Sequence, residues 1–504
     1  MLVTFDLDSY SQQAERFAIE MDREYYLHFS GRKEGYEIEA IYDRHAELFE
    51  RDSVETLRGL VGGAQGDAER RLRRLLELAI EGLIGRATKS QAAALAEREA
   101  TLEIELDGRV EPFRQAALLQ ANEPAPEARA KIEATRLAVQ ERELNPLMVE
   151  IAQRTQELVR GLGWPSYLAM HEQLKGFGIA ALERETSAFS DVVEARYREV
   201  VEPALRDQLG LGLAELRRSD MARFFRAPGF DELFARERLT EALERTLAGL
   251  GIDLHAQPNV TLDLEPRPHK SPRAFCSPVR VPQEIHLVMP TQGGREDYAT
   301  LLHEAGHTEH YAHASPEMPF EFRHLGDNSV TESFAFLFEH LTENPAWLRA
   351  VLGVETPDDY ARFARAAKIV FLRRYAAKLS YELALHGGER PLSEMPALYS
   401  ETLGRAIEVE WPRVTYLSDV DNAFYAANYL RAWALETHWR RLLVERFGER
   451  WFDSADAGAF LRGLWAQGQR LRADELLAEV TGERLDFGVM AAEVAEAATC
   501  HCSQ

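Results

Sequence analysis

The stretch "TLLHEAGHTEH", residues 300–310, contains two histidines four positions apart, with a glutamate directly after the first. Four residues of an α-helix turn through about 400° and rise about 6 Å, so His303 and His307 would project from one face. Two imidazoles arranged in this way can bind one Zn²⁺ at about 2.0–2.1 Å each. Glu304, one step around the helix, would accept a proton from a water molecule that the metal activates.

This spacing alone does not define a metal site, because a helix with two surface histidines gives the same pattern. Composition alone would produce it in roughly a few per cent of such chains. Catalytic zinc normally has three protein ligands and one open position, so the hypothesis requires a third ligand.

Glu332, in "GDNSVTESFAFLFEHL" (326–341), is the main candidate for that ligand. The segment begins with helix-capping chemistry at 327–329, and Glu332 falls among phenylalanines in the first turns. A glutamate in apolar surroundings needs a compensating partner, and a metal ion is one. Asp327 and Glu339 are the fallback ligands, and the alternative is a glutamate that only interacts with the helix dipole.

His313 is the competing candidate, because it occupies the tenth position after His303, where metzincin zinc peptidases have their third histidine. Those proteins need glycine at the seventh position so that the chain turns back, and here that residue is His310. If the helix continues, His313 lies about 15 Å along the axis from His303, too far to share an ion.

The elements that must position these residues are mostly helical. Residues 5–250 show helical periodicity, broken at 121–128 and after a second stretch over 126–162. Alternating patterns then predict three short strands, in 259–267, 273–281 and 284–290, which would form a small antiparallel sheet. A helix is expected to begin near Arg295, and the chain is helical again from Asn328. The sequence therefore predicts a mainly α fold.

Composition excludes several classes of function. The 504 residues carry a net charge of −24, with a pI near 5.2, which argues against nucleic acid as a partner. We expect no signal peptide and no membrane-spanning helix. Three cysteines favour the reducing cytoplasm. Two of them, Cys500 and Cys502, could hold a soft metal, although a frayed terminus is the simpler interpretation.

The motif residues resemble those of the thimet oligopeptidase and oligoendopeptidase F family of zinc peptidases. In that family the His-Glu-x-Gly-His helix has a further histidine three residues on, matched here by His310. The glutamate ligand follows the first histidine by 29 residues, as Glu332 follows His303, and a second glutamate follows seven residues later, as Glu339 does. The segments "RAFC" (273–276) and "NAFYAANYLRAW" (422–433) resemble the family's cleft-edge strand and tyrosine segment.

The resemblance implies a large helical peptidase fold with a deep cleft, in which residues 256–504 form the catalytic lobe and residues 1–255 a helical lobe that covers the cleft. One Zn²⁺ per chain would be held by His303, His307 and Glu332, with Glu304 as general base. The substrates would be short peptides. The hydroxyl of Tyr429 or Tyr425 would stabilise the oxyanion, and Ala274, Phe275 and Cys276 would pair with the substrate backbone.

One departure from the family concerns a histidine about nine residues before its tyrosine, where this chain has Asp419 and Asp421. That difference leaves open how the oxyanion is held. The angiotensin-converting-enzyme and Taq-type carboxypeptidase families have similar ligand spacing, so carboxypeptidase action is an alternative. A non-peptidase zinc amidohydrolase and a peptide-binding pseudo-enzyme are the others. Nothing in the sequence assigns an oligomeric state.

Overall fold

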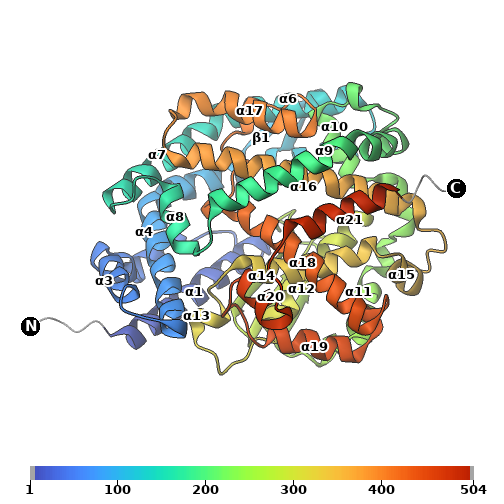
Figure 1. Ribbon diagram of the computed structural model, residues 1–504. Coiled ribbons are helices and arrows are strands. Elements are labelled where there is room, and N and C mark those ends of the chain that lie inside the picture. The colour runs from blue at the N-terminus through green and yellow to red at the C-terminus, as the bar shows by residue number, and fades with distance from the viewer. Residues whose placement is uncertain (1–5, 500–504) are drawn as a thin grey trace, which may run out of the picture.

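Helices dominate the computed structural model, which describes residues 6–499 (Figure 1). This confirms the predicted mainly α fold. The helices of the first half are α1 (Leu7–Phe29), α2 (Ile38–Arg44), α3 (Arg51–Val61), α4 (Gly66–Thr101), α5 (Ala116–Asn122), α6 (Pro126–Glu143), α7 (Asn145–Gly161), α8 (Tyr167–Lys175), α9 (Ile179–Leu209), α10 (Arg218–Arg226) and α11 (Leu239–Gly249). Those of the second half are α12 (Arg295–Ala312), α13 (Phe320–Arg323), α14 (Asn328–Glu339), α15 (Pro345–Trp347), α16 (Asp358–Gly387), α17 (Met395–Ile407), α18 (Tyr425–Phe447), α19 (Ala455–Trp465), α20 (Ala473–Thr481) and α21 (Phe487–Thr499).

The expectation of nearly unbroken helix over residues 5–250 is wrong at one place. A hairpin of β1 (Glu103–Leu106) and β2 (Arg109–Pro112) follows α4. Asp107 and Gly108 form its turn, both with positive φ (53° and 76°), which is the usual chemistry of a two-residue hairpin. The inward side chains of β1 pack with residues of α5 and α6 in a small separate core.

The predicted strands form a three-stranded sheet in the order β3 (Val260–Asp263), β5 (Glu284–Val288), β4 (Phe275–Arg280). The prediction of a purely antiparallel sheet is wrong. β4 and β5 are antiparallel, but β3 pairs with β5 in parallel. An alternating pattern predicts which residues face the core but carries no information on which edge of the hairpin a third strand joins.

Lys270, in the segment between β3 and β4, supports the parallel pairing of β3 with β5. It does so at the carboxyl ends of these two strands. The buried ammonium group of Lys270 donates to the carbonyl oxygen of Asp263, at the end of β3, at 2.8 Å. The same group donates to the carbonyl oxygen of Met289, just after β5, at 3.0 Å. One side chain therefore joins the carboxyl ends of both strands.

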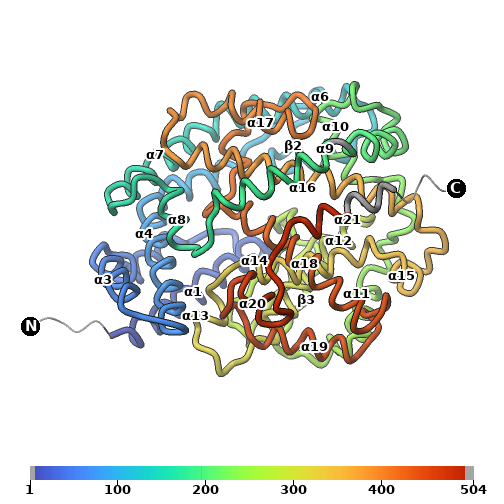
Figure 2. The backbone as a smooth tube through the Cα atoms, viewed as in Figure 1, coloured from blue at the N-terminus to red at the C-terminus, as the bar shows by residue number. Residues whose placement is uncertain are grey.

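A single large hydrophobic core contains residues from both halves of the chain, from Tyr10 to Met490. In Figure 2 the trace of α9, from the first half, runs beside that of α16, from the second, and the two helices are in contact. α14 packs between α12 and α18 near the middle of the molecule. The assignment of residues 1–255 to a lobe that covers the cleft and of residues 256–504 to a catalytic lobe stays a prediction. In the described part of the chain, no helix is both long and apolar enough to cross a membrane.

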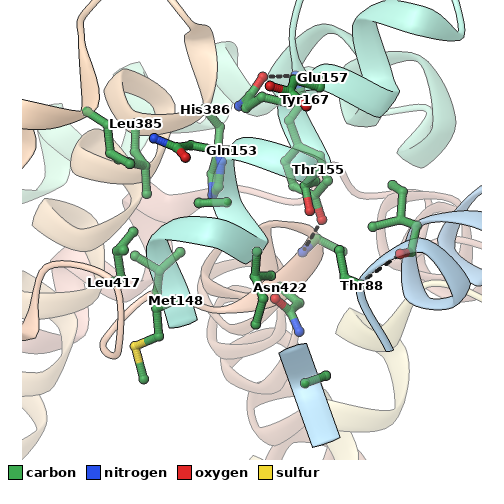
Figure 3. Close-up of a pocket in the computed structure, with 18 of the residues that line it drawn as sticks. Thr88, Met148, Gln153, Thr155, Glu157, Tyr167, Leu385, His386, Leu417 and Asn422 are labelled. Atoms are coloured by element: carbon green, nitrogen blue, oxygen red, sulfur yellow. Dashed lines mark hydrogen bonds between the residues drawn. The ribbon is translucent and has the colours of Figure 1, made fainter. Parts of the chain in front are cut away.

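A large cavity, of about 1150 Å³, lies between the two halves (Figure 3). Its walls come mainly from α4, α7, the end of α16 and the segment 417–423. Among residues 6–499, none of those that line it belongs to α12, which opens on a different and smaller cavity.

Candidate metal centre

The site is built where α12 and α14 approach each other closely. α12 begins at Arg295, as expected, and carries both histidines. Gly306 permits the close packing, because a Cβ there would lie 2.4 Å from the carbonyl oxygen of Phe334 and 2.6 Å from the Cα of Ala335. α14 begins after Asp327, whose side chain accepts a hydrogen bond from the backbone N–H of Ser329, so the predicted N-cap is present.

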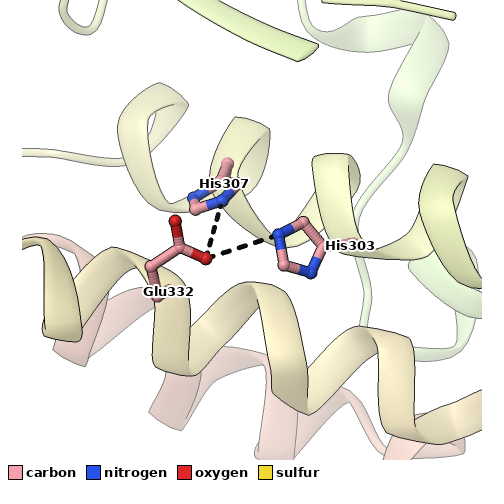
Figure 4. A group of neighbouring side chains, drawn as sticks. All are labelled: His303, His307 and Glu332. Atoms are coloured by element: carbon pink, nitrogen blue, oxygen red, sulfur yellow. Dashed lines mark ion pairs between the residues drawn. The ribbon is translucent and has the colours of Figure 1, made fainter. Parts of the chain in front are cut away.

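The structure brings His303, His307 and Glu332 together, as Figure 4 shows. The Nε2 atoms of both histidines lie 3.4 Å from Oε2 of Glu332. Ligands at about 2.0–2.1 Å from a tetrahedral ion are separated by about 3.4 Å, so these distances fit zinc. Oε2 of Glu332 is buried and has no hydrogen-bond partner among the described residues. A buried carboxylate oxygen without such a partner needs a cation, and these three residues fit one.

The other polar atoms of the three residues are occupied by neighbours. Nδ1 of His303 lies 2.8 Å from Oε2 of Glu339, and Nδ1 of His307 lies 2.8 Å from Oγ1 of Thr331. The hydroxyl of Tyr425 donates to Oε1 of Glu332 at 2.6 Å. These partners leave both Nε2 atoms and one carboxylate oxygen to share an ion, the usual pattern around metal-binding histidines.

Charges within the cluster shift two pKa values in opposite directions. Burial lowers the pKa of His303, but the adjacent carboxylates of Glu332 and Glu339 outweigh burial and raise that pKa well above its ordinary value. Burial likewise opposes ionisation of Glu332, yet the adjacent imidazoles hold its pKa well below the usual range. The surroundings therefore stabilise the ionised form of Glu332 through adjacent positive charge, and a bound cation would supply such a charge.

Glu304 and Tyr429 line a cavity of about 330 Å³ together with His303. The described residues provide no hydrogen bond or ion pair to the Glu304 carboxylate, so it is free to act on a bound molecule. The Glu332 carboxylate and burial raise the pKa of Tyr429 well above its ordinary value, which keeps this phenol protonated as a hydrogen-bond donor.

The two candidate tyrosines therefore differ in what they contact. Their rings lie 5.0 Å apart, but only Tyr425 is bonded to Glu332. Within residues 6–499, nothing hydrogen-bonds to the hydroxyl of Tyr429, a residue that lines the same cavity as Glu304. Tyr425 is therefore the hydrogen-bond partner of the candidate ligand Glu332. The hydroxyl of Tyr429 has no such partner among the described residues and can donate a hydrogen bond to a bound molecule.

His310 and the alternative ligands His313 and Asp327 lie in different surroundings. Nε2 of the buried His310 lies 3.2 Å from the carbonyl oxygen of Gly468, and burial lowers the pKa of His310 to about 3. Nδ1 of His313 lies 3.0 Å from the carbonyl oxygen of Glu309. Asp327 is bonded to α18 and α20 as well as to its own helix. Cys500 and Cys502 lie outside the described residues.

The predicted substrate strand lies beside α12. β4 is an edge strand of its sheet, and the hydroxyl of Thr308 lies 3.5 Å from Sγ of Cys276. Phe275 packs against Tyr25 of α1, with ring centroids 5.1 Å apart. Burial and the Glu304 carboxylate raise the pKa of Tyr25. Sequence patterns could not predict that Tyr25 lies near Glu304, because only tertiary packing brings α1 to the site.

Asp419 and Asp421 are both held in ion pairs. Asp419 contacts the guanidinium of Arg374 and accepts a hydrogen bond from Tyr399 at 2.6 Å. Asp421 pairs with Lys378 at 2.6 Å. Both aspartates thus fix the segment that leads into α18, and they offer no donor for an oxyanion.

Comparisons with known proteins add no family assignment, because no protein-family model and no curated protein matches the sequence. The resemblance to oligopeptidases therefore rests on the motif residues and their placement.

Proposed function

We propose that this chain is a zinc-dependent peptidase that hydrolyses short peptides. The observation that carries the proposal is the approach of Oε2 of Glu332 to Nε2 of both histidines, each at 3.4 Å, with no other polar partner for that oxygen in the described chain. The free Glu304 carboxylate and the Tyr429 hydroxyl, on the wall of the adjoining cavity, support hydrolysis rather than a purely structural ion.

In this proposal His303, His307 and Glu332 hold the ion. Bound zinc supplies Lewis acidity, which polarises a carbonyl group and lowers the pKa of water. Glu304 accepts the proton of the attacking water and passes it to the leaving amine. Tyr429 donates a hydrogen bond to the carbonyl oxygen as negative charge develops there.

Substrate placement is also part of the proposal. β4, the edge strand of its sheet, would offer backbone groups to an extended peptide, and Phe275 with Tyr25 would offer an aromatic contact near Glu304. A cytoplasmic location is proposed from the low cysteine content.

A mass-spectrometric screen of a mixed peptide library tests the function. The zinc-loaded protein should cleave peptides, and a chelator should stop the cleavage. Internal products indicate an endopeptidase, whereas stepwise loss from the carboxyl end indicates a carboxypeptidase. Intact peptides after incubation with zinc-loaded protein would contradict the proposal.

A further inference from the structure

A second group of metal-ligating side chains lies between α4 and α8, in a different part of the fold from the first site. Glu77 and Glu81 are one helical turn apart on α4, and His171 belongs to α8. One ligand atom from each residue lies within 4.8 Å of the other two. One imidazole and two carboxylates form a donor set that divalent transition metals accept.

His171 is the most unusual member of this group. The side chain is completely buried, yet neither ring nitrogen has a hydrogen-bond partner among the described residues. The ring contacts Tyr167 and Phe424 through their aromatic faces and edges, at centroid distances of 4.4 and 5.8 Å. A buried imidazole without a hydrogen bond to either nitrogen is energetically unfavourable, so this position favours a ligand.

The carboxylates of Glu77 and Glu81 also have no hydrogen-bond or ion-pair partner within residues 6–499. Glu81 is on the wall of the large cavity, which gives a cation a path from solvent. Glu81 is exposed on that wall, and desolvation by the neighbouring protein together with the Glu77 charge raises the pKa of Glu81 to about 7. Two adjacent carboxylates repel each other, and a bound cation would remove that repulsion.

Lys175, Arg74 and His386 are the basic groups around the cluster. Lys175 donates to Oδ1 of Asn428 at 3.2 Å; its charge opposes the effect of burial on the pKa of Glu81 and adds to the effect of burial on the pKa of His171. Burial lowers the pKa of His386 to about 4, so that ring is neutral. The guanidinium of Arg74 interacts with Glu77, so the unpartnered buried imidazole and the three convergent ligand atoms, rather than net charge, point to a cation.

We propose that Glu77, Glu81 and His171 bind a second divalent transition-metal ion, of the manganese or zinc type, independently of the first site. The ion would join α4 to α8. His171 contacts Phe424, which has a positive φ of 54° and directly precedes Tyr425. The second ion would thus stabilise the turn that leads to the tyrosine bonded to Glu332.

Binding of Mn²⁺ alone, followed by the electron paramagnetic resonance signal of the free ion, tests the proposal. Mn²⁺ is chosen because the thiols of the C-terminal segment bind it poorly. Metal-free wild type should bind two ions per chain, and Glu332→Ala should bind one. Adding Glu77→Gln and Glu81→Gln to Glu332→Ala should weaken the remaining binding at least tenfold, with the circular dichroism spectrum unchanged.

Glu97→Gln is the matched control, since Glu97 is exposed on the same helix outside the cluster, and it should not alter binding. The second site is refuted if Glu332→Ala binds no Mn²⁺, or if the two glutamine substitutions leave its remaining ion in place. Failure of the first site gives a different result: wild type and Glu332→Ala would then bind the same number of ions.

Discussion

Each proposed zinc ligand presents one atom to the ion position and has another polar atom held by a neighbour. Glu339 holds His303, Thr331 holds His307 and Tyr425 holds Glu332. Such partners fix the ring orientation and the protonated nitrogen before any ion binds. At the scale of single residues, the chemistry therefore depends on a second set of side chains.

Glu332→Ala should remove one zinc equivalent per chain, because it leaves two ligands and an unfilled coordination shell. His313→Ala is the matched control, since His313 bonds to its own helix and should leave zinc unchanged. Metal analysis after dialysis measures both. Loss of zinc from His313→Ala but not from Glu332→Ala would contradict this ligand set.

The two tyrosines should separate metal binding from catalysis. Tyr425→Phe removes the hydrogen bond to Glu332 and should lower zinc affinity, about 10–100-fold for a lost partner of this kind. Tyr429→Phe should keep zinc and lower kcat, since Tyr429 lines the cavity and makes no hydrogen bond to Glu332. Zinc affinity and kcat are measured for both variants; the reverse pattern of effects would contradict these two roles.

At the scale of elements, the distance between α12 and α14 sets the ligand geometry. Gly306→Ala should force the helices apart and destabilise the protein by about 1–3 kcal/mol, as overpacking does, and zinc affinity should fall with it. Gly59→Ala is the matched control, because open space surrounds Gly59 in α3, and alanine there should be neutral or stabilising. Denaturant unfolding and zinc titration of both variants provide the measurement. Unchanged zinc affinity in Gly306→Ala would contradict this account.

Asp327 joins three elements of the site. It caps α14 and accepts hydrogen bonds from Asn428 of α18 and from the backbone of Ala473 at the start of α20. Despite burial, the Arg431 guanidinium and these donors hold the pKa of Asp327 well below its usual range. A lowered folded-state pKa means that the carboxylate stabilises the protein above its unfolded pKa, near 3.9, and that this stabilisation is lost as the pH falls below it.

Asp327→Asn should therefore lower the free energy of unfolding by about 1.5–3 kcal/mol at pH 7. The difference from wild type should shrink as the pH falls below about 4. Asp474→Asn is the control, since Asp474 contacts the same Arg431 from a more exposed position and should have a smaller effect. Denaturant unfolding at several pH values tests this; a difference that grows at low pH would contradict the role of Asp327.

At the scale of the whole molecule, local patterns could predict the helices and the three proposed ligands. The spacing of His303 and His307 requires only one helix, and Glu332 stands out because its neighbours are apolar. Thr331 and Tyr25 could not be assigned, since their roles depend on how α14 rotates and where α1 packs. The same holds for His171 and Glu77, which only tertiary packing brings together. The parallel pairing of β3 also depends on a long-range choice that alternation does not encode.

The central claim is that Glu304 acts as the base beside a zinc site that it does not build. Glu304→Gln is nearly isosteric, so the variant should fold and retain zinc, yet its amide cannot accept a proton from water. Zinc content and kcat/KM on a quenched fluorescent peptide, measured together for wild type and variant, test this directly. We expect full zinc content with kcat/KM reduced about 10²–10⁴-fold or more. Near-wild-type cleavage by the zinc-loaded variant would contradict the proposed mechanism.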